Sequence, residues 1–258
     1  MSNTQADRVI LITGAGSGIG AALARRLASP AARLLLHGRG GDAAGRARLE
    51  AVAGACRTAG AEVETAFGDL GEGGVGAAAV GKALAAFGRI DRIVHNAGFA
   101  DRRAFGELTR EHLDASWRAM PGAFLEIVTA ALPSLSVSTA GRVVAVSSFV
   151  AHRFVKGQLF PASAAAKAAL EALAKSLAVQ LAPTGTTVNI VVPGFTRKDE
   201  GKLGALSQAA WAEAATRNPQ GRLASPEDVA AAIAFLLSAA AAHITGATIP
   251  VDGGLTLG

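Results

Sequence analysis

Short apolar runs alternate along the chain with longer alanine-rich segments of helical period. Runs with the length and composition of strands stand at residues 9–12, 33–37, 62–67, 92–94, 142–146, 188–192 and 248–249. Helical segments fall between them, for example at residues 19–27, 74–87, 110–132, 162–181 and 226–238. Regular alternation of the two kinds of element, with strands that are apolar throughout, predicts a parallel sheet covered by helices on both faces. The predicted fold class is α/β, with a doubly wound parallel sheet.

The length of 258 residues fits one domain, and the composition, 50% hydrophobic and 17% charged, supplies enough apolar surface to fold. Glycine-rich loops are expected at 38–41 and 71–74. A longer connection spans residues 193–220. Long ordered connections often form binding loops, so we expect residues 193–220 to be the substrate loop of a single domain, 1–258.

Charge and cysteine content narrow the class of protein. The chain has a formal net charge of +5, but its arginines are scattered and form only doublets, so we expect no nucleic-acid partner and attribute the charge to an anionic cofactor or substrate. The single cysteine, Cys56, cannot form an internal disulfide or a zinc cluster, and we expect it to be a small buried residue and the site to hold no metal. The start of the chain lacks a signal-peptide pattern, and the apolar run 230–242 is too short to span a bilayer. The prediction is a cytoplasmic protein without a membrane partner.

A glycine cluster directly follows the first predicted strand and opens the first predicted helix. It reads Thr13-Gly14-Ala15-Gly16-Ser17-Gly18-Ile19-Gly20. Glycines allow a tight turn and close backbone approach, and the N-terminus of a helix presents N–H groups to a pyrophosphate. In this strand–turn–helix context, the cluster predicts a dinucleotide site.

The spacing Thr-Gly-x-x-x-Gly-x-Gly resembles that of the short-chain dehydrogenase/reductase family. Further motifs of that family follow in order over the whole chain: Asp69-Leu70, His95-Asn96-Ala97-Gly98 with one change, Ser147-Ser148, Pro193-Gly194, the segment 218–228, and Val251-Asp252-Gly253-Gly254. The resemblance implies a Rossmann fold, a nicotinamide cofactor, a small-molecule substrate, and a homo-oligomer, tetramer or dimer, that forms contacts through the C-terminal helix and residues 249–254. It also implies that the cofactor contacts Thr13, Gly14, Ser17, Gly18, Ile19, Gly20, Arg39, Asp69, Leu70, Asn96, Ala97, Gly98, Lys167, Pro193, Gly194, Phe195 and Thr196.

The end of the second predicted strand bears on the choice of cofactor. An acidic residue there would favour NAD, whereas an arginine accommodates the 2′-phosphate of NADP. Gly38 stands at the place of the acid and Arg39 follows it. Since a guanidinium matches phosphate geometry, we expect NADP(H) to be preferred and NAD(H) to remain possible, with Arg39 then stacking on adenine.

The catalytic residues of the family are retained only in part. The family's Tyr-x-x-x-Lys pair carries proton transfer, with a serine that positions the substrate oxygen and an asparagine that holds a water relay. Lys167 matches the lysine and Ser148 the serine, but Ser163 stands at the tyrosine position, and the chain contains no tyrosine. Counting back from Gly122 places Ala119 at the asparagine. A threonine expected five residues after Pro193 is replaced by Lys198, although Thr196 lies close by.

The loss of the phenol limits the chemistry. Lys167 can lower the pKa of a phenol from about 10 toward neutrality, but an aliphatic hydroxyl is a far weaker acid. Ser163 can still donate a hydrogen bond. Reduction of an isolated ketone creates a basic alkoxide that needs an acid, whereas hydride addition to a C=C conjugated with a thioester gives an enolate that needs mainly fixed donors. Ser148, Ser163 and Lys167 suit the second reaction better.

One branch of the family also resembles this site. The 2,4-dienoyl-CoA reductases have serine in place of the tyrosine before the lysine, use NADPH, and carry an added tyrosine upstream. By count, His152 takes the place of that added tyrosine, and a histidine titrates near neutrality. In enoyl-ACP reductases of the Tyr-x6-Lys type, the tyrosine falls at Phe160, which we expect to be pocket wall.

Each candidate also has a plainer interpretation. Ser163 would fill space, Ser148 would end a strand, Lys167 would bind the nicotinamide ribose, and His152 would be a loop residue. Basic side chains that could attract the phosphate of an acyl carrier, or be scattered surface charge, are Arg102, Arg103, Arg153, Lys156, Lys198 and Lys202. Two functions remain open: an NAD(P)(H)-dependent oxidoreductase acting on an enoyl or oxoacyl thioester, and a catalytically silent dinucleotide-binding protein.

Overall fold

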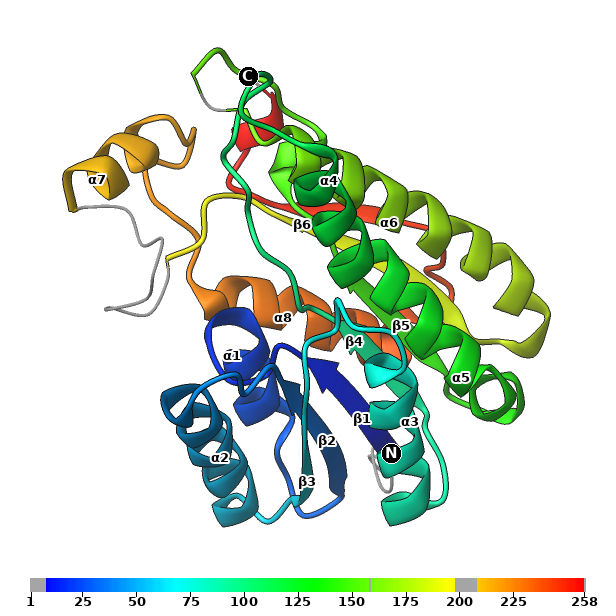
Figure 1. Cartoon of the computed structure of the whole chain (residues 1–258). Coiled ribbons are helices and arrows are strands. Elements are labelled where there is room, and N and C mark those ends of the chain that lie inside the picture. The colour runs from blue at the N-terminus through cyan, green and yellow to red at the C-terminus, as the bar shows by residue number, and fades with distance from the viewer. Residues whose placement is uncertain (1–7, 158, 198–207, 258) are drawn as a thin grey trace.

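Seven parallel strands form one sheet in the computed structural model, which describes residues 8–157, 159–197 and 208–257 (Figure 1). The strand order is β3-β2-β1-β4-β5-β6-β7, and every neighbouring pair is parallel. The predicted doubly wound α/β fold is confirmed. The strands are β1 (Arg8–Thr13), β2 (Ala32–Gly38), β3 (Glu62–Phe67), β4 (Arg92–His95), β5 (Arg142–Val146), β6 (Thr187–Pro193) and β7 (Thr248–Val251).

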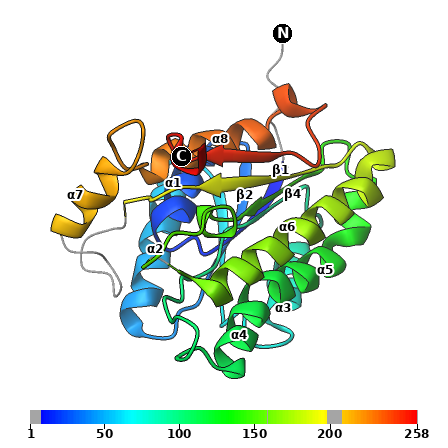
Figure 2. The ribbon, with the colours of Figure 1, turned by 90° about the horizontal axis from the view of Figure 1, so that it is seen from above.

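Helices connect the strands and cover both faces of the sheet (Figure 2). The α-helices are α1 (Gly18–Leu27), α2 (Ala43–Thr58), α3 (Val75–Phe87), α4 (Arg110–Trp117), α5 (Ala123–Val137), α6 (Pro161–Leu181), α7 (Gln208–Thr216) and α8 (Pro226–Leu237). Single turns are η1 (Arg118–Gly122), η2 (Phe149–Ala151), η3 (Ala182–Thr184), η4 (Ala239–Ala241) and η5 (Leu255–Leu257). Two helices, α2 and α7, were not among the examples named from the sequence; α2 lies between two predicted strands, and α7 lies in the connection 193–220.

The helix predicted at 110–132 is instead two α-helices joined by a π-helical turn, η1. Pro121 lies inside that turn and has no N–H to donate, and the Ala123 N–H reaches back to the Arg118 carbonyl, five residues away. By length and composition, the whole stretch Arg110–Val137 could cross a membrane. However, the α5 residues Phe124, Ile127 and Ala131 are buried in the protein core, so we interpret it as a core helix.

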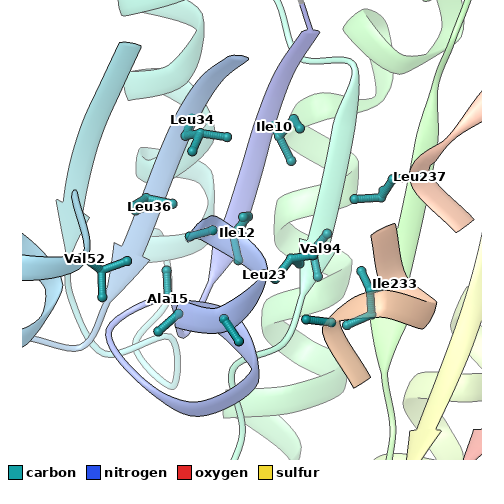
Figure 3. Close-up of a cluster of buried hydrophobic side chains, with 14 of the residues drawn as sticks. Ile10, Ile12, Ala15, Leu23, Leu34, Leu36, Val52, Val94, Ile233 and Leu237 are labelled. Atoms are coloured by element: carbon teal, nitrogen blue, oxygen red, sulfur yellow. The ribbon is translucent and has the colours of Figure 1, made fainter. Parts of the chain in front are cut away.

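The core lies in two layers, one on each face of the sheet. Ile10, Ile12 and Val94 point to the layer beneath α1, α2 and α8 (Figure 3). The intervening strand residues, such as Leu11 and Ile93, point to the layer beneath α3, α5 and α6. This alternation explains why the central strands are apolar on both faces, whereas the edge strand β3 is half-buried and carries Glu62 and Glu64. Cys56 is fully buried in the first layer, as predicted.

The strand order reverses between β1 and β4, and ligands of open α/β sheets bind at the carboxyl edge beside such a reversal. The loops that follow β1, β4, β5 and β6 all leave from this edge because the strands are parallel. The structure describes only part of the predicted substrate loop 193–220, in which α7 lies. Lys198 and Lys202 lie outside the described residues.

Candidate active site

The turn after β1 is built around three glycines, Gly14, Gly18 and Gly20, that no other residue could replace without strain or rearrangement. Gly14 and Gly18 have φ angles of 65° and 54°, in the left-handed region. A Cβ atom on Gly20 would lie 2.4 Å from the Gly14 carbonyl oxygen, so the start of α1 passes directly under the turn. A Cβ on Gly18 would meet nothing within 4 Å, which shows that this side of the turn is open. The turn therefore leaves space for a ligand at the N-terminus of α1.

The end of β4 is tied to this turn by four hydrogen bonds, all donated by Asn96 and Ala97. The Thr13 hydroxyl oxygen accepts from the Asn96 and Ala97 N–H groups, both at 3.0 Å. The Asn96 side chain donates to the carbonyls of Thr13 and Gly14 at 3.1 and 3.3 Å. The predicted cofactor residues of β1 and β4 are thus brought together as one rigid unit.

The end of β2 carries the residues that bear on cofactor choice. His37 is buried, and its burial lowers its pKa to about 4, so it is neutral at pH 7. Arg39 follows it with an exposed side chain. Asp69, also exposed, accepts a hydrogen bond from the Gly71 N–H at 2.9 Å, and Leu70 packs into the core. The guanidinium of Arg39 is therefore available at the carboxyl end of β2, where Gly38 stands in place of an acidic residue.

Lys167 lies under the carboxyl edge on α6 and is only 6% exposed. Its Nζ donates to the Val146 carbonyl at 2.6 Å, at the end of β5. A Cβ on Gly98 would lie 3.1 Å from this Nζ, so the loop after β4 passes close to the lysine and a larger residue there would press on it. Burial lowers the pKa of Lys167 to about 8, opposed by the nearby Glu171 carboxylate. At neutral pH the lysine is a desolvated cation held between the ends of β4 and β5.

His95, at the position where the family motif differs, is fully buried and packs edge-on against Phe124, with ring centroids 5.7 Å apart. Burial, and secondarily the charge of Lys167, lower its pKa to about 3. His95 is therefore neutral and adds no charge to the site.

Ser163 is one turn before Lys167, as predicted, but its hydroxyl is engaged by the loop after β4. It accepts a hydrogen bond from the Asp101 N–H at 2.8 Å and donates to the Phe99 carbonyl at 3.4 Å. The residue is 2% exposed. Asp101 is itself fixed by the Arg103 guanidinium at 2.7 Å. In this arrangement Ser163 holds the loop and does not present its hydroxyl to a substrate.

Ser148 begins the turn η2, where its hydroxyl oxygen accepts from the Val150 N–H at 3.4 Å; within the described segments its proton has no acceptor and is available for donation. Its neighbour Ser147 points the other way and donates to the buried carboxylate of Glu171. His152 binds the same carboxylate through Nε2 at 2.8 Å. Glu171 was not predicted, although its position four residues after Lys167 places the two on one helix face.

Three phenylalanines connect the elements that carry the predicted residues. The Phe149 ring lies 6.5 Å from Phe160 and 4.5 Å from Phe195, centroid to centroid. Phe149 follows Ser148, Phe160 precedes α6, and Phe195 follows Gly194. The rings thus bring together η2, the start of α6 and the exit of β6. The predicted role of Phe160 as pocket wall is consistent with this cluster.

The exit of β6 is fixed by backbone contacts. A Cβ on Gly194 would lie 2.9 Å from Asp252, so the chain passes close to the residues after β7. The Ala224 N–H donates to the Phe195 carbonyl at 3.0 Å, and the Thr196 hydroxyl donates to the Gly194 carbonyl at 3.2 Å. Pro193, Gly194, Phe195 and Thr196 therefore stand at the carboxyl edge with the other predicted cofactor residues.

These residues fit a nicotinamide dinucleotide. The open glycine turn provides backbone N–H groups for a pyrophosphate, Arg39 provides a cation for a phosphate on the adenosine ribose, and Lys167 provides a buried donor. They lie along one edge of one sheet, in the order expected for an extended ligand. Among residues 8–157, 159–197 and 208–257, no group of acidic, histidine and cysteine side chains could hold a metal ion.

Comparisons with known proteins agree with this geometry. A family model described as enoyl-(acyl carrier protein) reductase matches residues 14–256. The chain is 40% identical over 262 residues to cis-4-hydroxycyclohexanecarboxylate dehydrogenase of Sinomonas cyclohexanicum, covering 99% of both chains. It is 33% identical over 259 residues to a 3-oxoacyl-(acyl-carrier-protein) reductase of Vibrio cholerae, covering 96% of this chain and 97% of the relative. A short-chain dehydrogenase from Burkholderia cenocepacia, solved in complex with NADP, superposes with a TM-score of 0.87 at 31% identity over 98% of this chain and 99% of that one.

Proposed function

Because the chain belongs to the short-chain dehydrogenase/reductase family, we propose that it is an NAD(P)(H)-dependent oxidoreductase that works without a catalytic tyrosine and reduces an enoyl or oxoacyl thioester. The placement of Lys167 carries the proposal: a buried cation at the carboxyl edge, with its Nζ fixed on the Val146 carbonyl. Removing a charge from water costs free energy, and proteins keep such unfavourable arrangements mainly at functional sites. The names of the family model and of the Vibrio relative support a thioester substrate.

NADP(H) is the proposed cofactor, with NAD(H) as the alternative. When bound, it would donate or accept the hydride. The glycine turn 13–20, with Asn96 behind it, would hold the pyrophosphate, and Arg39 the 2′-phosphate. Lys167 would bind the nicotinamide ribose. The NADP complex of the Burkholderia relative supports this choice for a similar chain.

The chain's own donors favour an enolate over an alkoxide. Ser148 would donate to the substrate oxygen, and below about pH 8 the Lys167 charge would stabilise the negative oxygen. Neither group is a strong acid. An enolate spreads its charge and can be protonated from water, whereas a ketone's alkoxide requires a proton during the reaction.

His152 remains the proposed proton source, in an indirect role. Glu171 holds its Nε2, and Glu171 is eight residues after Ser163, which corresponds to about 12 Å along a helix axis. His152 would therefore act near the helical turn that carries Lys167, and not near Ser163. Its side chain is one-third exposed to solvent, and its bond to Glu171 connects it to the helix face that carries Lys167.

The test is turnover with NADPH on a panel of conjugated enoyl thioesters, oxoacyl thioesters and simple ketones, followed by loss of NADPH absorbance. Since one relative is a dehydrogenase of a cyclic hydroxy acid, that substrate class is assayed in the oxidative direction with NADP⁺. We expect thioester reduction that is lost in Lys167→Ala and kept in Lys175→Ala, an exposed lysine on the same helix. Reduction of simple ketones in preference to thioesters would contradict the proposal.

One observation favours a second candidate, a catalytically silent dinucleotide-binding protein. The Ser163 hydroxyl is bound to the Asp101 N–H and the Phe99 carbonyl, which leaves only Ser148 as a ready hydroxyl donor to a substrate among the residues predicted. Such a protein would bind NADPH as tightly as an enzyme but turn over no member of the panel. NADPH binding by titration, measured beside the turnover assay, separates the two candidates.

A further inference from the structure

Three arginines gather at the amino-terminal edge of the sheet, opposite the candidate active site. Arg8 lies on β1, Arg92 on β4 and Arg142 on β5, and these strands are neighbours. In the strand register, Arg92 is paired with Ile10 on one side and with Arg142 on the other. Paired residues of neighbouring strands are about 4.8 Å apart, so Arg92 and Arg142 start side by side.

All three side chains leave the same face. Side chains alternate along a strand, and each arginine is two residues before a member of the core layer beneath α1, α2 and α8: Ile10, Val94 and Val144. Arg142 confirms this direction, since its Nε donates to the Ser238 carbonyl at the end of α8 at 3.5 Å. Three guanidinium groups therefore point into one region between the sheet and α8.

The carboxylate nearest to the arginines is already occupied. Asp91 accepts hydrogen bonds from the Val9 N–H at 3.1 Å, the Ser138 hydroxyl at 2.6 Å and the Arg89 guanidinium at 2.5 Å. Its contact with Arg8 is longer, at 4.0 Å. Asp91 is thus one buried negative charge near four arginines, Arg8, Arg89, Arg92 and Arg142. Its hydrogen bonds come from Val9, Ser138 and Arg89, and not from the other three arginines.

Arg92 has no hydrogen-bonded partner among the residues that the structure describes. Arg142 donates to the Gly141 carbonyl at 2.7 Å as well as to Ser238. In the part of the chain that the structure describes, Arg92 makes no hydrogen bond or ion pair, its Nε is buried and unsatisfied, and the residue is 6% exposed. Burial, followed by the charges of Arg8 and Arg142, lowers its pKa to about 10, and the Asp91 carboxylate opposes this only in part. Buried guanidinium groups are normally paired, so the cluster has an unused capacity for negative charge.

We propose that Arg8, Arg92 and Arg142 form a binding site for a phosphate group, either inorganic phosphate or the phosphate of a small monoester. A guanidinium binds two phosphate oxygens through parallel N–H donors. The Asp91 carboxylate does not serve as this anion, because its oxygens are already bound by Val9, Ser138 and Arg89. An anion among the three arginines would satisfy Arg92 and screen the repulsion between like charges on neighbouring strands. The site is separate from the dinucleotide site because it lies at the other end of the strands.

The test is a titration of the full chain with phosphate, at constant ionic strength adjusted with chloride so that general screening does not contribute. We expect phosphate to raise the melting temperature of the wild type by about 5–10 °C at roughly 100 times its Kd. In Arg92→Met, which keeps most of the side-chain volume, we expect the Kd from calorimetry to rise at least about tenfold. Arg110→Met is the matched control, because Arg110 is an arginine whose side chain is 84% exposed. It should titrate as the wild type does.

Two further arms make the result decisive. Phosphate bound at the dinucleotide site would be retained in Arg92→Met, so only the part of the effect lost in this variant belongs to the arginine cluster. Arg92→Lys keeps the charge but not the paired donors, and it should bind phosphate more weakly than the wild type even if the methionine variant folds poorly. Inorganic phosphate and ribose 5-phosphate are titrated separately, and the tighter one identifies the source. Equal titrations for the wild type and both Arg92 variants, with either compound, would overturn the proposal.

Discussion

Replacing Lys167 by methionine should stabilise the protein at neutral pH while removing its activity. The pKa of Lys167 is lowered from 10.5 to about 8 by burial. The difference of about 2.5 units corresponds to about 3 kcal/mol of unfavourable free energy for holding the charged form in the fold. Methionine fills a similar volume without a charge. It also loses the hydrogen bond to the Val146 carbonyl, which costs about 1 kcal/mol. The expected net gain at pH 7 is about 2 kcal/mol.

The difference in unfolding free energy between the methionine variant and the wild type decreases as the pH rises from 8 to 10.5, and changes sign within this range. Below pH 8, Lys167 is protonated in both the folded and the unfolded chain, so the full cost is present. Between pH 8 and 10.5 the folded protein releases the proton first, and the wild type gains stability relative to the variant by about 1.4 kcal/mol per pH unit. Above 10.5 the lysine is neutral in both states and the cost is gone. At pH 9.5 the two proteins should differ by only about 0.5 kcal/mol.

Urea unfolding followed by tryptophan fluorescence at pH 7.0 and 9.5 measures this difference, and the absence of tyrosine removes phenol titration from the alkaline signal. Lys175→Met, on an exposed position of α6, is the control and should change stability by less than about 0.5 kcal/mol at either pH. A methionine variant at position 167 that is less stable than the wild type at pH 7, or whose difference does not change with pH, would refute the reasoning that a desolvated charge is held at this edge.

Four further outcomes are expected. Arg39→Ala should weaken NADPH binding about 10- to 100-fold and leave NADH binding unchanged, as measured by fluorescence titration; equal losses for both cofactors would argue against a 2′-phosphate contact. Gly20→Ala should lower the unfolding free energy by about 1–3 kcal/mol and abolish NADPH binding, because its Cβ would meet the Gly14 carbonyl at 2.4 Å. Ser163→Tyr should introduce reduction of simple ketones, and a variant that binds NADPH without reducing them would show that more than the acid is missing. Glu171→Gln should shift the alkaline limb of the pH profile to lower pH, since the carboxylate raises the pKa of Lys167; an unchanged limb would exclude that coupling.

The centre of the sheet could be predicted from the sequence because its strands are buried on both faces. Such strands are continuous apolar runs, and the range 142–146 agrees with β5 to the residue. The range 62–67 also agrees with β3, although this edge strand is only half-buried and carries Glu62 and Glu64. The break between α4 and α5 was not predicted, although Pro121 marks it. A proline in an apolar helical pattern can kink a helix or end it, and only the tertiary packing decides between these outcomes.

The parts of the candidate site that belong to local sequence motifs could be predicted. The hydrogen-bond partners that come from distant segments of the chain could not. The glycine turn and Asn96 form the expected unit because both follow strand ends in a parallel sheet. The partners of Ser163 come from a loop more than sixty residues earlier, which no spacing on α6 indicates. Glu171 did carry a signal, its position one turn after Lys167, but its binding of Ser147 and His152 depends on how η2 packs on the helix.

The hydrogen bonds of Ser163 do not by themselves exclude an enzyme in favour of a catalytically silent binding protein. Releasing the hydroxyl requires two hydrogen bonds to be exchanged for others, a net cost of about 2 kcal/mol. A competent state of that free energy is populated at roughly 3%, which weakens apparent substrate affinity by about 30-fold and does not abolish turnover. Under the proposed mechanism turnover depends instead on Lys167, whose Nζ is buried and held on the Val146 carbonyl. The balance at this edge therefore favours an oxidoreductase whose substrate tolerates a weak acid.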